Sequence, residues 1–382
     1  MYRTVGELIT KAKVEKCGDR ELPILSMTMH DGIMFQGDRF KKQIASVDQS
    51  TYNVVYRNQL VVSFPIDEGV LAVQDITDAG IVSPAYKIWN VDEKKVVPKY
   101  LEAYLRSPHS IQYYKSKLRG TTARRRSITD SDLLEMDIPL PSIEKQRCII
   151  ENIRRVKSMQ DAYNCKMDLL DKLIKARFVE MFGNPVGNPY GWEKCTLKEV
   201  CTKLNDGTHF SPESFEKGDY KYITAKNIKR DGFDFSNITY VPEEVHRSIY
   251  ERCNPEYGDV LYIKDGATTG IAMVNSLREE FTLLSSVALL KQDRSIMNGE
   301  FLCSVLNNDE MYLDIRNNMG GAAITRLTIA KLNGIKIIVP PIGLQEQYAN
   351  FVKQIDKSKV VVQKALDETK LLFDSLMQQY FG

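Results

Sequence analysis

Residues 142–183 read SIEKQRCIIENIRRVKSMQDAYNCKMDLLDKLIKARFVEMFG, a stretch without proline whose one glycine is its last residue. Its apolar side chains recur at steps of three, four and seven residues, which places them on one face of a long helix. These side chains are Ile149, Ile153, Val156, Tyr163, Met167, Leu170, Ile174 and Met181. We therefore predict a first long helix over residues 142–183.

A second stretch of the same kind, residues 342–382, closes the chain and also finishes in Phe-Gly. Lys359 and Thr369 fill the two open positions of its four-three heptad series, whose apolar members are Tyr348, Val352, Ile355, Val362, Leu366, Phe373 and Leu376. A helix with one apolar stripe is unstable alone, so the two stretches are predicted to pair as an antiparallel coiled coil. About 35 residues at about 1.5 Å each give a length of about 50 Å.

The residues before the two predicted helices repeat one another. The segment ITDSDLLEMDIPLPSIEKQ at 128–146 recurs as LTIAKLNGIKIIVPPIGLQEQ at 327–347, and Leu133 and Leu332 match at a spacing of 199. A two-residue insertion in this alignment matches Gln146 with Gln347. Fainter matches join 57–63 to 257–263, 83–88 to 285–290 and 100–105 to 301–306. Each half therefore reads as a mixed α and β unit followed by a long helix.

These patterns predict an α+β fold with two mixed α/β domains, two long antiparallel helices and a pseudo-twofold internal repeat. The predicted boundaries are a first globular domain at 1–141, a first long helix at 142–183, a linker at 184–195, a second globular domain at 196–341 and a second long helix at 342–382. Residues 183–191 contain two prolines and three glycines. They forbid continuous helix or strand there, which marks a domain boundary.

The composition is that of a soluble globular protein, with 382 residues, 43% hydrophobic and 27% charged. The seven cysteines are scattered and never form a C-x-x-C pair, so neither a disulfide framework nor a zinc site is predicted. No apolar run approaches the roughly 18 residues of a membrane span, and the first residues lack a signal-peptide pattern. We expect a cytoplasmic protein.

The charge is divided unevenly along the chain. Residues 1–126 carry 20 basic and 14 acidic side chains, a net +6, whereas residues 184–330 carry 16 and 21, a net −5. Residues 106–126, RSPHSIQYYKSKLRGTTARRR, hold seven basic residues and no acidic one. A basic stretch with interleaved aromatics is typical of a phosphate-facing surface, and the alternative is a solvated helix end and loop. The candidate DNA-binding residues here are Lys115, Lys117, Arg119, Arg124, Arg125 and Arg126.

Catalytic motifs are missing from the sequence. It contains no G-x-G-x-x-G after a strand, no G-x-x-x-x-G-K-[ST] and no H-E-x-x-H, and its four histidines lie far apart. We predict no catalytic residue and no metal site. The pattern favours a binding protein over an enzyme.

Polar loops in the second half supply side chains that contact phosphates and base edges in other proteins. We expect a locally basic patch at residues 221–230 despite the net acidic charge of this half. Exposed polar loops without a ligand are the alternative for each residue. The candidates are Thr208, His209, Lys226, Asn227, Lys229, Arg230, Thr268, Thr269, Asn317, Asn318 and Arg326.

Two segments carry a resemblance to a known family. PLPSIEKQ at 139–146 and VPPIGLQEQ at 339–347 each lead into a long helix that ends in Phe-Gly. This arrangement resembles the DNA specificity subunit of Type I restriction-modification systems over essentially the whole chain. DGTH at 206–209, YITAKNI at 222–228 and GDVL at 258–261 are also similar to that family's target-recognition domain.

The resemblance implies a non-catalytic bacterial or archaeal subunit in which each target-recognition domain reads one half of a split site in double-stranded DNA. The helices then set the spacer and dock two methyltransferase subunits, through the exposed residues Arg154, Arg155, Lys157, Lys357 and Lys364, for which a solvated helix face is the alternative. S-adenosylmethionine, ATP and Mg are implied on the methyltransferase and restriction subunits, and no cofactor on this chain.

Two other readings stay open from the sequence. A related bipartite system that only methylates, or that cuts on both sides of its site, differs from the first reading only in its partner chains. A helical scaffold that joins proteins without touching DNA belongs to another class. The bases recognised do not follow from loop sequences.

Overall fold

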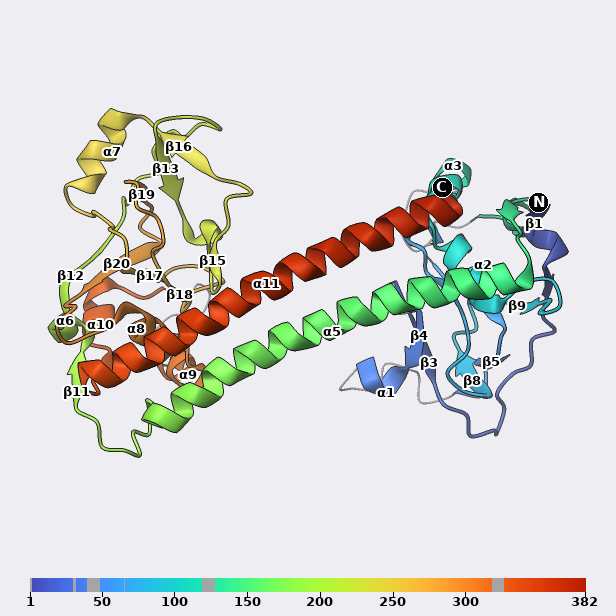
Figure 1. Ribbon diagram of the computed structural model, residues 1–382, viewed down its shortest axis with the longest axis horizontal. Helices are drawn as coiled ribbons and strands as arrows, with labels where there is room; N and C mark the ends of the chain where they lie inside the picture. The colour runs from blue at the N-terminus through green and yellow to red at the C-terminus, as the bar shows by residue number, and fades with distance from the viewer. Residues whose placement is uncertain (1, 30–31, 40–48, 65, 119–127, 318–325) are drawn as a thin grey trace. The chain divides into compact units, whose positions relative to one another are not determined.

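The computed structural model describes residues 2–29, 32–39, 49–64, 66–118, 128–317 and 326–382 (Figure 1). The chain forms two compact units. Unit 1 comprises Met1–Asn164 with Lys364–Gly382, and unit 2 comprises Cys165–Gln363. The division falls inside both long helices, so each unit holds a globular domain and a part of each helix. The segment 184–195 lies within unit 2. None of the described helices is both long and apolar enough to cross a membrane.

Unit 1 is built on a four-stranded antiparallel sheet in the order β2-β9-β6-β7. Its strands are β1 (Tyr2–Thr4), β2 (Ile9–Lys11), β3 (Leu25–Thr28), β4 (Gly32–Phe35), β5 (Asn53–Tyr56), β6 (Leu60–Val62), β7 (Leu71–Val73), β8 (Ala79–Val82), β9 (Lys87–Val91) and β10 (Asp137–Pro139). Its helices are η1 (Val5–Glu7), α1 (Gln36–Arg39), η2 (Ile66–Glu68), α2 (Pro98–Leu105), α3 (Pro108–Lys117) and α4 (Asp130–Leu134). Among these strands, β1 pairs with β10, β3 with β4 and β5 with β8.

Unit 2 has the corresponding sheet in the order β12-β20-β17-β18 and a second sheet in which β13 lies between β16 and β19. Its strands are β11 (Lys194–Thr196), β12 (Cys201–Asp206), β13 (Tyr220–Ile223), β14 (Ile228–Lys229), β15 (Gly232–Phe233), β16 (Thr239–Val241), β17 (Val260–Ile263), β18 (Ala272–Val274), β19 (Thr282–Leu283), β20 (Val287–Gln292) and β21 (Lys336–Ile338). Its helices are α6 (Leu197–Val200), η4 (Ala225–Asn227), α7 (Glu243–Tyr250), α8 (Gly299–Leu306), α9 (Asp309–Asn317) and α10 (Ile329–Asn333).

Strand register confirms the internal repeat. Val62 of β6 is paired with Leu71, and Tyr262 of β17 is paired with Ala272 in the same way. The first strand of each globular domain also repeats, because β1 pairs antiparallel with β10, and β11 pairs in the same way with β21. The predicted fold class, with two mixed α and β domains and two long helices, is therefore confirmed. The second domain begins at β11, within the segment predicted as a linker.

The two long helices are α5 (Ile143–Phe182) and α11 (Ile342–Phe381), with 40 residues each. Inside unit 1 they run antiparallel, because Asn152 Nδ2 donates to Tyr380 Oη at 3.1 Å and Gln160 Nε2 donates to the Thr369 carbonyl at 3.1 Å. Inside unit 2 the ring of Phe178 lies 5.6 Å from that of Tyr348. Both parts of the pairing follow the predicted apolar faces, which are turned inward.

The two open positions of the second heptad series are explained by their contacts. The amine of Lys359 forms ion pairs with Asp171 of α5 and with Asp356 of its own helix, so a charged side chain is accommodated at the helix pair. Thr369 is buried and its hydroxyl donates to the Leu366 carbonyl at 2.8 Å. Neither position interrupts α11.

The first turn of each long helix buries a glutamine in equivalent surroundings. Gln146 Oε1 accepts the Val97 amide at 2.8 Å, and Gln345 Oε1 accepts the Asn298 amide at 2.9 Å. Both amide nitrogens donate back to a proline carbonyl five residues earlier. The predicted match of Gln146 with Gln347 is therefore wrong, since Gln347 is exposed. Both helices start and end at a spacing of 199, and no insertion is needed.

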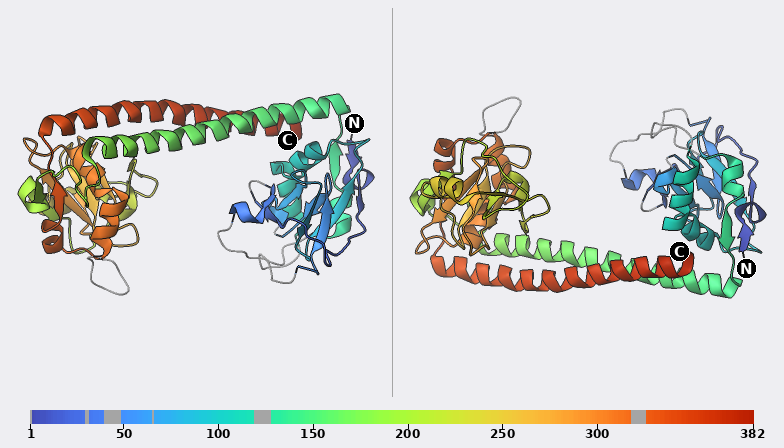
Figure 2. Two further views of the ribbon diagram at one scale, coloured as in Figure 1. Left: turned by 90° about the horizontal axis from the view of Figure 1, so that it is seen from below. Right: turned by 90° about the horizontal axis from the view of Figure 1, so that it is seen from above.

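The last phenylalanine of each helix enters a core. Phe381 is 3% exposed, and its ring lies 5.5 Å from that of Tyr100 on α2 in unit 1. Phe182 is fully buried in unit 2, 4.7 Å from the ring of Phe301 on α8. In unit 2 the end of α5 and the start of α11 lie side by side against α8 and α9 (Figures 1 and 2). Each domain core therefore anchors the C-terminus of one long helix and the N-terminus of the other.

Candidate nucleic-acid interface

The site in unit 2 begins where β12 ends, at Asp206-Gly207-Thr208. A Cβ on Gly207 would lie 1.9 Å from the Leu283 carbonyl oxygen, so only glycine fits. Thr208 is 3% exposed, its amide donates to the Leu283 carbonyl at 2.8 Å, and its own carbonyl accepts the Ser285 amide at 2.9 Å. This close approach fixes the backbone from which His209 projects.

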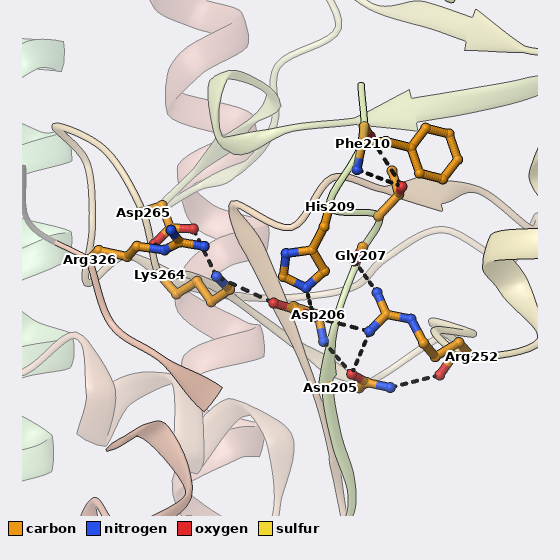
Figure 3. A network of polar contacts seen from close by, with 10 residues as sticks. Asn205, Asp206, Gly207, His209, Phe210, Arg252, Lys264, Asp265 and Arg326 are labelled. Atoms are coloured by element: carbon orange, nitrogen blue, oxygen red, sulfur yellow. Dashed lines mark hydrogen bonds and ion pairs between the residues drawn. The ribbon is translucent and has the colours of Figure 1, made fainter. Parts of the chain in front are cut away.

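A buried lysine joins two carboxylates beneath this segment (Figure 3). Lys264, 1% exposed, follows strand β17 directly, and its Nζ lies 3.3 Å from Asp206 Oδ2 and 2.8 Å from Asp265 Oδ2. Removing an ammonium group from water is costly unless it is paired and hydrogen-bonded. The two carboxylates compensate the lysine and are themselves held in place by it.

Three basic side chains surround this pair of carboxylates at the surface (Figure 3). His209 Nε2 lies 3.2 Å and Arg252 Nη1 3.4 Å from Asp206 Oδ1, and Arg252 also donates to the Gly207 carbonyl. Arg326 Nε lies 3.5 Å from Asp265 Oδ1. All three keep 45% to 60% of their side-chain area exposed. The arrangement presents several hydrogen-bond donors to an anionic or polar ligand.

The equivalent position in unit 1 has different chemistry. Val62 of β6 and Tyr262 of β17 are equivalent in the strand register. Phe64 lies two residues after Val62 and Lys264 two residues after Tyr262, so Phe64 occupies in unit 1 the position that Lys264 occupies in unit 2. It lines a small pocket with Ile128 and Asp130. Asp130 accepts Lys87 Nζ at 2.6 Å and Lys11 Nζ at 2.9 Å. Burial raises the pKa of Asp130, but the hydrogen bonds from Lys11 and Lys87 leave it below its ordinary value. One scaffold therefore carries two different polar sites.

The structure divides the predicted residues of the second half into exposed and buried groups. Three side chains are buried and hold turns: Thr208 Oγ1 donates to the Phe210 carbonyl, Thr269 Oγ1 donates to the Gly266 carbonyl at 2.7 Å, and Asn227 Oδ1 accepts the Thr224 amide at 3.0 Å. Asn318 lies outside the described residues. The exposed ones are His209, Lys226, Lys229, Arg230, Thr268, Asn317 and Arg326. Among these, only His209 and Arg326 join the described network of Lys264.

The predicted basic patch at 221–230 is partly neutralised. Lys221 forms an ion pair with Glu279, and Lys229 Nζ lies 3.7 Å from Asp234 Oδ2. Arg230 is near Asp309 of α9, whose pKa is lowered first by the hydrogen bond from Lys175 and also by the charge of Arg230. The pattern of residues therefore overstated the free positive charge of this patch.

The remaining predicted residues lie on helices or outside the description. Lys115 and Lys117 are exposed on α3, and Arg119, Arg124, Arg125 and Arg126 fall outside the described residues. On α5, Arg154 and Arg155 both pair with Glu151, at 3.0 and 3.1 Å, and Lys157 Nζ lies 5.6 Å from the centre of the Phe373 ring. On α11, Lys357 is exposed and Lys364 lies 4.0 Å from Glu368.

Four members of the network were not predicted: Asp206, Arg252, Lys264 and Asp265. One local signal was available, because Lys264 and Asp265 follow four buried strand residues directly and charges in that place need partners. Within the described parts of the chain, no three His, Cys, Asp or Glu residues gather in a way that suits a metal ion.

Comparisons with known proteins agree on one family. Residues 189–369 match the family model of the Type I restriction modification DNA specificity domain. The chain is 21% identical to the specificity subunit of the type I restriction enzyme MjaIX of Methanocaldococcus jannaschii over 305 residues, 74% of this chain and 68% of that one. It is also 21% identical to the MjaVIII specificity subunit of the same organism over 277 residues, 66% of this chain and 64% of that one.

Solved structures show the same fold over the full length. The S subunit of a Type-I restriction-modification system from M. genitalium superposes with a TM-score of 0.59 at 17% identity, covering 100% of this chain and 96% of that one. A chain from a structure that describes complex assembly and conformational transition of a type I R-M system superposes with a TM-score of 0.60 at 19% identity, covering 100% and 97%.

Proposed function

Because the chain belongs to the family of Type I restriction-modification DNA specificity subunits, we propose that it is a non-catalytic subunit that reads a bipartite site in double-stranded DNA. Unit 1 reads one half of the site and unit 2 reads the other. The two long helices set the unspecified spacer between the halves. Members of this family supply DNA-sequence recognition to their restriction-modification systems.

The observation that carries this proposal is the contrast between the two domains at one equivalent position. The strand register is the same, yet unit 2 continues β17 with the charged Lys264 and unit 1 continues β6 with Phe64. Two domains that recognise different DNA sequences need different side chains at equivalent positions of a shared scaffold, and the residues after β17 and β6 differ in this way. Protein side chains read bases through different donor and acceptor patterns, so different sites select different half-sites.

We assign the enzymatic steps of the complex to its other subunits. Two methyltransferase subunits, with S-adenosylmethionine, methylate adenine, and restriction subunits, with ATP and Mg, cut unmodified DNA. Long helices with exposed arginines and lysines, among them Arg154, Arg155, Lys357 and Lys364, support docking of the methyltransferase subunits along α5 and α11.

Methylation mapping tests the proposal. Genomic DNA from cells with and without this chain is sequenced for N6-methyladenine, with the methyltransferase partner present in both. We expect one split motif to be fully methylated only when the chain is present. An unchanged methylation pattern would contradict the proposed function, and a continuous motif would contradict the bipartite reading.

An exchange of domains tests which half belongs to which unit. The exchange is made over residues 197–334, between β11 and β21, which keeps the β11–β21 pair and both long helices. With the corresponding segment of another family member, we expect one half of the motif to change and the other half and the spacer to stay. Loss or change of both halves would show that the units do not read independently.

A further inference from the structure

Arg326 combines an anchored backbone with an exposed side chain. Its backbone forms a bridge with Asp265, and the next amide, of Leu327, donates to the Lys264 carbonyl at 2.9 Å. Leu327 is 3% exposed, and Thr328 then caps helix α10. The base of the Arg326 side chain is therefore attached to the core, while 60% of the side chain is exposed.

One edge of the Arg326 guanidinium faces a carboxylate, and the other edge carries the two terminal nitrogens. Nε lies 3.5 Å from Asp265 Oδ1, an ion-pair contact without a hydrogen bond, and Nη1 and Nη2 make no hydrogen bond to a described residue. Asp265 is in turn held through its other oxygen by Lys264 at 2.8 Å, and Lys264 by Asp206. The carboxylate beside Arg326 is thus fixed by a buried lysine (Figure 3), and among the described residues the two terminal nitrogens keep an open fork.

The fold alone does not require these buried charges. Unit 1 has the same strand register with Phe64 in place of Lys264 and forms its core without a lysine there. Replacing a buried ion network by apolar side chains is often neutral or stabilising. The charges of Asp206, Lys264 and Asp265 therefore serve the side chains that they position at the surface, namely His209, Arg252 and Arg326.

The open fork matches one base edge in particular. Arginine donates two parallel hydrogen bonds to O6 and N7 of guanine in the major groove. A phosphate accepts the same fork but is held mainly by net positive charge. The Asp265 carboxylate reduces the net charge that Arg326 offers to a phosphate, while its attraction draws the Nε edge of the guanidinium toward the protein. Orientation without much net charge favours a base edge over the backbone.

The geometry points to Arg326 as the residue that reads a guanine in the half-site of unit 2, with Asp265 as its positioning residue. This inference rests on the proposed function and goes beyond it, because it names one side chain and the base that it selects. Lys264 is the support that prevents Asp265 from turning away.

The test uses the full chain assembled with its methyltransferase subunits. The motif is first read from the methylation pattern of the wild type, and duplexes are then made with every single base-pair change in both halves. Arg326→Lys keeps the charge and removes the fork. We expect it to lower affinity for the wild-type motif roughly 5- to 150-fold and to abolish discrimination at one G·C pair of the unit 2 half. Preferences in the other half should stay unchanged.

A second variant and a matched control separate positioning from folding. Asp265→Asn leaves the arginine in place and should weaken discrimination at that same G·C pair only. Arg294→Lys is the control, because Arg294 is 62% exposed and lies 3.7 Å from Asp259, in an ion pair like that of Arg326 but outside the network. It should leave every base preference unchanged.

Three results would overturn the inference. The first is that Arg326→Lys keeps all base preferences of the wild type. The second is that Arg326→Ala weakens binding to all duplexes equally and lowers the number of counterions released on binding by about one, as loss of a phosphate contact predicts. A unit 2 half-site without a G·C pair would exclude it as well. A wild-type complex without any sequence preference would instead remove the proposed function, and this inference with it.

Discussion

Gly207 shows how a single residue positions the site. Its α-carbon passes so close to strand β19 that a methyl group would overlap the Leu283 carbonyl at 1.9 Å. We expect Gly207→Ala to destabilise unit 2 by about 1–3 kcal/mol or more, because the backbone of β12 or β19 must move. Urea unfolding followed by Trp192 fluorescence measures the change. Gly343→Ala is the control, because no atom lies within 4 Å of its added methyl group, and similar losses in both variants would contradict the argument.

His246 predicts a pH dependence of stability. It is fully buried on α7, where Nδ1 lies 2.9 Å from Thr282 Oγ1 and its ring stacks on Tyr220 at 3.8 Å. Burial lowers its pKa from 6.5, and this effect outweighs the hydrogen bond to Glu280, which raises it. The charges that face the ring are Glu280, Glu243 and Arg247.

The sign follows from proton binding. The unfolded chain binds a proton at this histidine more readily than the folded one, so the stabilisation is complete above about pH 6.5 and is lost as the pH falls below it. The slope is at most about 1.4 kcal/mol per pH unit. We expect unfolding free energies of the wild type to fall more between pH 7.5 and 5.5 than those of His246→Phe. Between pH 8.5 and 7.5 the two should change alike, and equal changes in both intervals would contradict this assignment.

At the scale of the elements, the buried glutamine defines where each long helix begins. Gln146→Leu and Gln345→Leu each leave a partly buried backbone amide without its acceptor, at Val97 and at Asn298. We expect a loss of about 1–3 kcal/mol in the unit that contains the change, unit 1 for the first and unit 2 for the second. Trp89 lies in unit 1 and Trp192 in unit 2, so fluorescence measured in a Trp192→Phe or a Trp89→Phe background follows one unit at a time.

Gln347→Leu provides the matched control for this pair. Gln347 is exposed, and it is the residue that the sequence alignment placed opposite Gln146. We expect its replacement to change stability by no more than about 0.5 kcal/mol. If Gln347→Leu were as damaging as Gln345→Leu, the structural equivalence of Gln146 and Gln345 would be wrong.

At the scale of the whole molecule, the two long helices are predicted to act as a ruler. Seven residues inserted after Asn164 and seven after Gln363, where the units divide, lengthen each helix by about 10 Å and keep the heptad phase. We expect the spacer of the methylated motif to grow by about three base pairs, since ten base pairs span about 34 Å. Both half-sites should stay the same. An insertion into one helix alone breaks the pairing and serves as the control.

The long helices and the repeat were predictable from the chain because their signals are local or periodic. The apolar positions of α5 recur every three to four residues, and the two halves repeat at a spacing of 199, so neither depends on how distant segments meet. The predicted match of Gln146 with Gln347 failed because Gln345 and Gln347 are both plausible partners when only the sequence is compared. Burial of Gln345 against Asn298 decides between them, and burial is a property of the packed helix and domain.

The site itself required the tertiary structure. Asp206, Arg252, Asp265 and Arg326 come from four segments as much as 120 residues apart, and pairing of β12 with β20 and of β20 with β17 brings the first of them to Lys264. The partners of an ion pair do not recur at a fixed spacing in the sequence. The sequence therefore shows that these side chains are polar or charged but not which of them are paired. Sequence periodicity set the helices and the duplication, and strand register decided which charges are buried together and which stay exposed at the surface.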